Sequence, residues 1–142
     1  MICPCRKAEE TSTTKTRVQD HNLEYSTCCG PIHADLKNGT TPESIMRARY
    51  SAYVQKNLDF LEKTLDPQTR TNFDSKSTQE WAESAEFKGL KILKSQILGN
   101  KGVVEFKVTY VLNEEEILHH EVSQFRRHIG QWFFREGKIK TS

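Results

Sequence analysis

The chain has no long hydrophobic run and no strong excess of charge. None of its 142 residues belongs to an apolar stretch near the roughly 18 residues that a membrane span requires, and the formal net charge is only +2. The start Met1-Ile2-Cys3 offers neither the basic nor the apolar segment of a secretory signal. We therefore expect a cytoplasmic protein without a membrane partner. The sequence also has no phosphate-binding loop, nucleophile elbow or dinucleotide-binding glycine motif, so it gives no support to enzymes that depend on one of these motifs.

Cysteine is absent after Cys29, which makes the four N-terminal cysteines informative. Cys3 and Cys5 flank a proline, and Cys28 and Cys29 are adjacent. Zn²⁺ accepts four thiolates in a closed structural site, whereas a reducing cytosol disfavours the three disulfide pairings that four cysteines allow. Inert buried cysteines are a weaker alternative, because the polar segment between the pairs could not build an apolar pocket. We predict one zinc ion bound by all four sulfurs.

The length favours one sizeable core with a small additional module. Residues 6–27 are almost wholly polar and predict a loop or a short helix. Turn-forming residues at 35–41 predict a linker. We therefore divide the chain into a zinc-binding module with its linker, residues 1–38, and a single domain, residues 39–142.

Helix signals follow the linker. Thr41 can cap a helix with Pro42 in its first position, and apolar residues then recur at helical spacing as far as Leu58. Asp66-Pro67 ends this helical stretch. A shorter helix is predicted over residues 78–87, around Trp81.

The second half of the chain has the pattern of antiparallel strands. Strands are predicted over 89–98, 104–112, 117–127 and 131–135, with turns between them. Helices followed by a hairpin-linked sheet indicate an α+β fold. We expect a curved sheet wrapped over the long helix, and the inside of such a cone is usually a pocket.

Three blocks of the sequence resemble the bacterial YchJ family. They are Cys28-Cys29-Gly30-Pro31-Ile32-His33, then Met46-Arg47-Ala48-Arg49-Tyr50-Ser51-Ala52-Tyr53, then His120-Glu121-Val122-Ser123-Gln124-Phe125 with Gln131-Trp132-Phe133-Phe134. The resemblance implies a nuclear-transport-factor-2-like cone behind an N-terminal SEC-C motif, which is similar to the zinc tail of the SecA translocase motor. It implies four zinc ligands: Cys3, Cys5, Cys28 and Cys29. The spacer between the two cysteine pairs is longer here than in usual SEC-C motifs.

Candidate pocket residues come from the long helix, the shorter helix and the sheet. They are Arg47, Arg49, Tyr50, Tyr53, Trp81, His120, Glu121, Ser123 and Trp132. The aromatic side chains are also expected to pack in the core, and either arginine could clamp an anion. A carboxylate-oriented base is possible only for His119 with Glu121, because successive side chains of a strand point to opposite faces. The family-like block contains His120 instead, so the two arguments disagree and no catalytic residue is assigned.

The function preferred from the sequence is a zinc-binding adaptor or scaffold whose zinc module docks a protein partner. A small-molecule-binding protein or enzyme that uses the cone pocket is one alternative. Contact with a ribosome or nucleic acid through the zinc module is another, and basic residues near the C-terminus could contribute to it. Protection of the sheet edge by charge is the preferred explanation for these basic residues. They are Arg126, Arg127, Arg135, Lys138 and Lys140.

Overall fold

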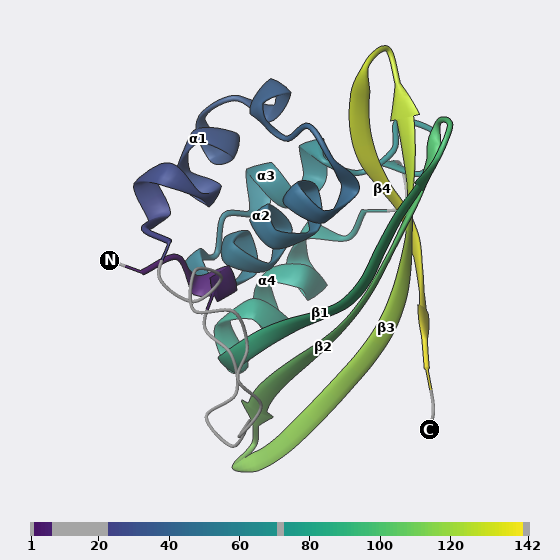
Figure 1. The fold of residues 1–142 in the computed structure, drawn as a ribbon. Helices are drawn as coiled ribbons and strands as arrows, with labels where there is room; N and C mark the ends of the chain where they lie inside the picture. Colours follow the sequence, from purple (N-terminus) through teal and green to yellow (C-terminus); the bar gives the residue numbers. More distant parts are fainter. Residues whose placement is uncertain (1, 7–22, 71–72, 141–142) are drawn as a thin grey trace.

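Helices cover one face of a curved antiparallel sheet in the computed structural model, which describes residues 2–6, 23–70 and 73–140 (Figure 1). The predicted α+β arrangement is confirmed. The helical elements in chain order are η1 (Pro4–Arg6), η3 (Tyr25–Thr27), α1 (Cys29–Ala34), η4 (Leu36–Asn38), α2 (Pro42–Gln55), α3 (Leu58–Lys63) and α4 (Ser75–Ser84). The loop or helix expected over residues 6–27 lies largely outside the described residues.

Helix α2 begins at a capping box. The Thr41 hydroxyl accepts a hydrogen bond from the Ser44 backbone N–H at 3.0 Å, and the Ser44 hydroxyl accepts one from the Thr41 N–H at 3.1 Å. Pro42 occupies the first helical position, where its missing N–H costs nothing. The helix ends at Lys56, whose left-handed backbone has a φ of 59°. The predicted start of the long helix is thus confirmed.

Two shorter helices also begin at side-chain caps. Asn57 accepts from the Phe60 N–H at 3.1 Å at the start of α3, and Asp74 accepts from the Ser77 N–H at 3.1 Å at the start of α4. The helix predicted over 78–87 is therefore corrected to Ser75–Ser84, and Phe87 belongs to the first strand. Among the described residues, no helix is long and apolar enough to cross a bilayer.

The described sheet has the strand order β1-β2-β3-β4, with every neighbouring pair antiparallel. The strands are β1 (Glu86–Leu98), β2 (Lys101–Leu112), β3 (Glu115–His128) and β4 (Gln131–Ile139). Two-residue turns join them and contain backbone with positive φ, as tight hairpins require. The register places Val108 opposite His119 and Phe106 opposite Glu121, which decides which side chains face the helices.

The described residues before position 39 contain the four cysteines and are called the cysteine module below. This module, α2 and the sheet contribute to one cluster of buried side chains. Cys3, Cys5 and Cys29 are fully buried and belong to the same cluster as Ile45 and Phe60. His33 adds a direct link, because its Nε2 lies 2.8 Å from the Ala48 carbonyl of α2. The division of the chain near residue 38 stays a prediction. Side chains that precede residue 38 pack against side chains that follow it.

Asp66 fastens the segment after α3 to the edge of the sheet. Its backbone N–H donates to the Phe134 carbonyl of β4 at 2.8 Å, and its side chain is fully buried. Arg126 donates to both carboxylate oxygens at 2.6 and 2.7 Å, and Arg135 donates to one of them at 3.2 Å. These bonds, chiefly those from Arg126, hold the pKa of Asp66 well below its usual range.

Replacing Asp66 with Asn should lower the free energy of unfolding by about 3 kcal/mol at pH 7, because it leaves Arg126 without its charged partner. The folded-state pKa lies well below the unfolded value of about 3.9, so the stabilising effect of the carboxylate is complete above that value and is lost progressively as the pH falls through the folded-state pKa. Urea unfolding should therefore show a smaller difference between the two proteins at pH 3 than at pH 7.

The matched control is Asp59→Asn. Asp59 is 87% exposed and lies 3.8 Å from Lys63, so its loss should change stability by less than about 0.5 kcal/mol. Equal stabilities of wild type and D66N at pH 7 would contradict the role given to Asp66.

Candidate metal centre and ligand cavity

Four cysteine sulfurs converge beside α2. Their ligand atoms all lie within 4.8 Å of one another, and Cys5 Sγ is 3.5 to 3.6 Å from the sulfurs of Cys3, Cys28 and Cys29. Metal–sulfur bonds of about 2.3 Å in a tetrahedron place sulfurs about 3.8 Å apart. The donor set and its spacing therefore fit a tetrahedral metal ion held by four thiolates.

Two polar side chains donate hydrogen bonds to cysteine sulfurs. Ser51 of α2 donates its hydroxyl to Cys29 Sγ at 3.3 Å, and Arg6 donates its Nε–H to Cys28 Sγ at 3.4 Å. Hydrogen bonds, the largest of them with Cys29, lower the pKa of Cys28 to about 6, whereas the bond with Cys28 raises the pKa of Cys29 and of Cys5 above the ordinary value. Arg47 donates to the Cys5 carbonyl at 2.9 Å and so ties the first cysteine pair to α2.

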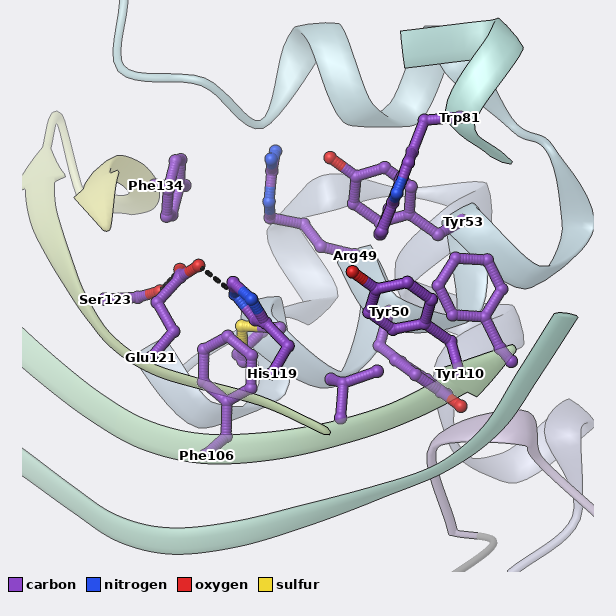
Figure 2. A pocket seen from close by; sticks show the side chains of 13 residues that line it. Arg49, Tyr50, Tyr53, Trp81, Phe106, Tyr110, His119, Glu121, Ser123 and Phe134 are labelled. Atoms are coloured by element: carbon purple, nitrogen blue, oxygen red, sulfur yellow. Dashed lines mark hydrogen bonds and ion pairs between the residues drawn. The ribbon is translucent and has the colours of Figure 1, made fainter. Parts of the chain in front are cut away.

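A cavity of about 180 Å³ lies between α2, α4 and the concave face of the sheet (Figure 2). Aromatic rings form much of its wall, and they meet edge to face: Trp81 lies 5.2 Å from Tyr53, 5.3 Å from Phe87 and 5.4 Å from Tyr110, measured between ring centroids. The complete lining is Met46, Arg49, Tyr50, Tyr53, Trp81, Phe87, Phe106, Val108, Tyr110, His119, Glu121, Ser123 and Phe134.

The polar end of the cavity is a short hydrogen-bond chain on β3. His119 Nε2 lies 2.7 Å from Glu121 Oε1, and the Ser123 hydroxyl donates to the other carboxylate oxygen (Figure 2). Burial raises the pKa of Glu121, but the bonds with His119 and Ser123 outweigh it, so the pKa lies below its ordinary value. Glu121 is therefore an ionised acceptor, with its side chain 18% exposed and that of His119 28% exposed.

Arg49 brings a buried positive charge to the same cavity. Its Nη1 donates to the Leu61 carbonyl at 2.9 Å and to the Thr64 hydroxyl at 2.6 Å, and its guanidinium carbon lies 4.5 Å from the centre of the Phe134 ring. Burial lowers its pKa, an effect that Tyr53 and Glu121 oppose. An arginine keeps its proton in proteins, so the cavity contains a fixed cation.

A family model described as "YchJ, middle NTF2-like domain" matches residues 41–137. The chain belongs to the YchJ family. The resemblance seen in the sequence is confirmed, and so is the nuclear-transport-factor-2-like fold with four clustered cysteines at its N-terminal end. A curated relative, the UPF0225 protein GSU1048 of Geobacter sulfurreducens, is 35% identical over 139 residues, which are 96% of this chain and 78% of the relative.

Two solved structures of SEC-C motif containing proteins resemble this YchJ-family chain. The solution structure of RPA3114 from Rhodopseudomonas palustris has a TM-score of 0.80 at 38% identity and covers 84% of this chain and 94% of its own. The crystal structure from Psychrobacter arcticus has a TM-score of 0.79 at 28% identity and covers 99% and 83%. Both neighbours are described as SEC-C motif containing proteins, and this chain has a cluster of four cysteines. Together these two findings support metal binding by this chain.

Six of the nine pocket candidates line the cavity, and the expectation for the other three is corrected. Arg49, Tyr50, Tyr53, Trp81, Glu121 and Ser123 belong to the lining. Arg47 points toward the cysteines. Trp132 of β4 is buried and packs against Arg127. His120 lies on the outer face of the sheet. There it bonds with Glu105 at 2.7 Å, because its neighbour His119 takes the inner face.

The lining also includes residues that the sequence analysis did not select. Phe106, Val108 and Tyr110 alternate along the strand predicted over 104–112, and in the structure they form part of the cavity wall. The strand argument identified His119 as the only histidine that shares a face with Glu121, and the structure confirms that pair. His119 is not among the nine pocket candidates, because the family-like block contains His120. The alternation of the strand was the better signal.

Replacing Ser51 with Ala should weaken metal binding by about 10- to 100-fold, because the hydroxyl that bonds with Cys29 Sγ is lost. Competition with a chromophoric chelator, with Zn²⁺ as the probe ion, measures this change. Ser95→Ala on the exposed part of β1 is the control and should bind as wild type does. Unchanged affinity of S51A would show that Ser51 does not support the site.

Proposed function

We propose that this chain binds a small, ring-sized molecule in the cavity beneath α2 and holds Zn²⁺ as a structural ion. The cavity is the observation that carries this proposal. Its aromatic wall and its polar end are built from different elements, α2, α4 and the sheet, which converge on one space. Ligand sites in proteins have this composition, mostly apolar with a few converging polar groups.

The cavity volume limits the ligand to about one ring. An apolar cavity of about 150 Å³ is known to hold benzene in another protein, and the cavity here measures about 180 Å³. Larger molecules would have to extend out of the cavity. A planar ring also suits the wall. The aromatic side chains of the wall pack edge to face with one another, and an aromatic ligand can pack against them in the same way.

Replacing Val108 with Phe should fill the cavity and weaken binding of phenol, used as a single-ring probe, by more than tenfold. Burial of a ring contributes more than about 1.4 kcal/mol, which corresponds to that factor. Chemical-shift titration of ¹⁵N-labelled protein measures the affinity. Val122→Phe, on the outer face of β3 opposite Glu105, is the matched control and should bind phenol as wild type does. Failure of wild type to bind any single-ring probe would contradict the proposal.

Zn²⁺ is the metal that we propose for the four cysteines. Four thiolates with tetrahedral spacing suit zinc, and a site with four protein ligands is closed and structural rather than catalytic. Three of the four cysteines are fully buried, so the ion would be enclosed by the fold.

Elemental analysis of protein purified without chelator should find one zinc per chain. Double replacement of Cys28 and Cys29 with Ser should abolish it, because two of four ligands are lost. Wild-type protein with no bound metal and four titratable thiols would contradict this assignment.

Docking of a protein partner by the cysteine module is a second candidate. Ile2 and Leu23 are 38% and 36% exposed beside this module and are joined through the Cys3 N–H, which donates to the Leu23 carbonyl at 2.9 Å. Such exposed aliphatic side chains suit an apolar contact. Nucleic-acid binding has less support, because Arg126 and Arg135 bind Asp66 and Lys140 lies 3.4 Å from Glu105.

A further inference from the structure

The hydrogen bond with Glu121 decides which nitrogen of His119 is available. An ionised carboxylate only accepts, so the proton of that bond sits on His119 Nε2. The neutral ring then has its lone pair on Nδ1. In the part of the chain that the structure describes, no hydrogen bond involves this Nδ1. Glu121 itself is occupied by His119 and Ser123, so the ring nitrogen is the basic group that remains.

The same cavity holds a group that can stabilise a new negative charge. Arg49 is buried, and its Nη1 donates to the Leu61 carbonyl and the Thr64 hydroxyl at the end of α3, which holds the guanidinium in place. Arg49 and His119 both line the cavity (Figure 2). A fixed cation in a partly water-excluded site stabilises developing charge without rearrangement. The cavity therefore combines an oriented base with a buried positive charge.

The geometry points to a proton-transfer site, in which His119 acts as a general base on a ring-sized compound with an acidic C–H. This inference rests on the proposed ligand cavity and names the chemistry of its substrate. The substrate class is a small carbonyl or heteroaromatic compound whose deprotonation places negative charge on oxygen. Glu121 is the positioning residue, because its carboxylate accepts the Nε2 proton of His119 and so fixes the tautomer of the ring.

The proposed step needs no second reactant. The Nδ1 lone pair of His119 takes the proton, and the C–H bonding electrons move through the substrate to its oxygen, which becomes an anion near Arg49. The protonated ring is stabilised by Glu121. It then returns the proton to another carbon of the same anion, so the substrate is isomerised and His119 is neutral again.

The chain contains its own control for this chemistry. His120 lies next to His119 and makes the same kind of pair, with its Nε2 2.7 Å from Glu105 Oε2, but on the outer face of the sheet. Neither His120 nor Glu105 lines the cavity. A reaction that merely needs a histidine–carboxylate pair at the surface would depend on His120 as much as on His119.

The test uses base-promoted ring opening of isoxazole, a single-ring probe, with metal-loaded protein. Removal of its C3 proton breaks the N–O bond and yields the enolate of cyanoacetaldehyde, which is followed by absorbance. We expect saturable acceleration by wild type, and His119→Gln should lower kcat/KM by about 100-fold or more, the usual contribution of a general base. His120→Gln should leave kcat/KM unchanged.

Glu121→Gln tests the positioning role. Its amide oxygen can still accept from His119, but the negative charge beside the ring is gone. We therefore expect a lower kcat with KM nearly unchanged, and recovery of kcat in Glu121→Asp would indicate that the charge matters. If H119Q does not fold, this pair of variants still decides the question.

Phenol titration of the same samples separates the two proposals. Phenol binding together with a rate that His119→Gln does not change would overturn the proton-transfer inference and leave ligand binding intact. Equal losses of rate in H119Q and H120Q would overturn it as well. If neither phenol nor isoxazole binds, the proposed ligand cavity fails and the inference fails with it.

Discussion

Helix α2 is the wall on which both candidate sites depend. Arg47 and Ser51 are four residues apart and contact the cysteine module, whereas Arg49 and Tyr53, also four apart, line the cavity. A two-residue step turns a helix by about 200°, so these pairs face nearly opposite directions. The capping box at Thr41 and Ser44 fixes where the helix starts and so supports the position of both pairs. A metal centre and a ligand cavity can thus share one helix without sharing side chains.

The sheet adds the second constraint, which is the alternation of its strands. Phe106 and Val108 on β2 face the cavity beside Glu121 and His119 on β3, and the intervening Glu105 and His120 face outward. Two adjacent histidines consequently make similar carboxylate pairs in different surroundings. Only the inner pair shares a cavity with a buried cation, Arg49, which is why chemistry is proposed for one histidine and not for its neighbour.

Local rules predicted much of this arrangement. The cap before Pro42 and the alternation around Val108 depend on nearby residues, and the structure has both. The predicted start of α4 at residue 78 is wrong, because the side chain of Asp74 caps the helix and starts it at Ser75. The positions of Arg47 and Trp132 depend on contacts between distant segments, and no spacing in the sequence reports the rotation of α2 relative to the cysteines or the register of β4.

The most direct measurement is a crystal structure of the zinc-loaded protein with a single-ring ligand bound. The account predicts one ion among the sulfurs of Cys3, Cys5, Cys28 and Cys29 on the Ser51 side of α2. It also predicts the ring on the other side of the helix, between Trp81 and His119. A ring bound only on the outer face of the sheet, or a cavity closed by the side chains of Arg49 and Trp81, would contradict it.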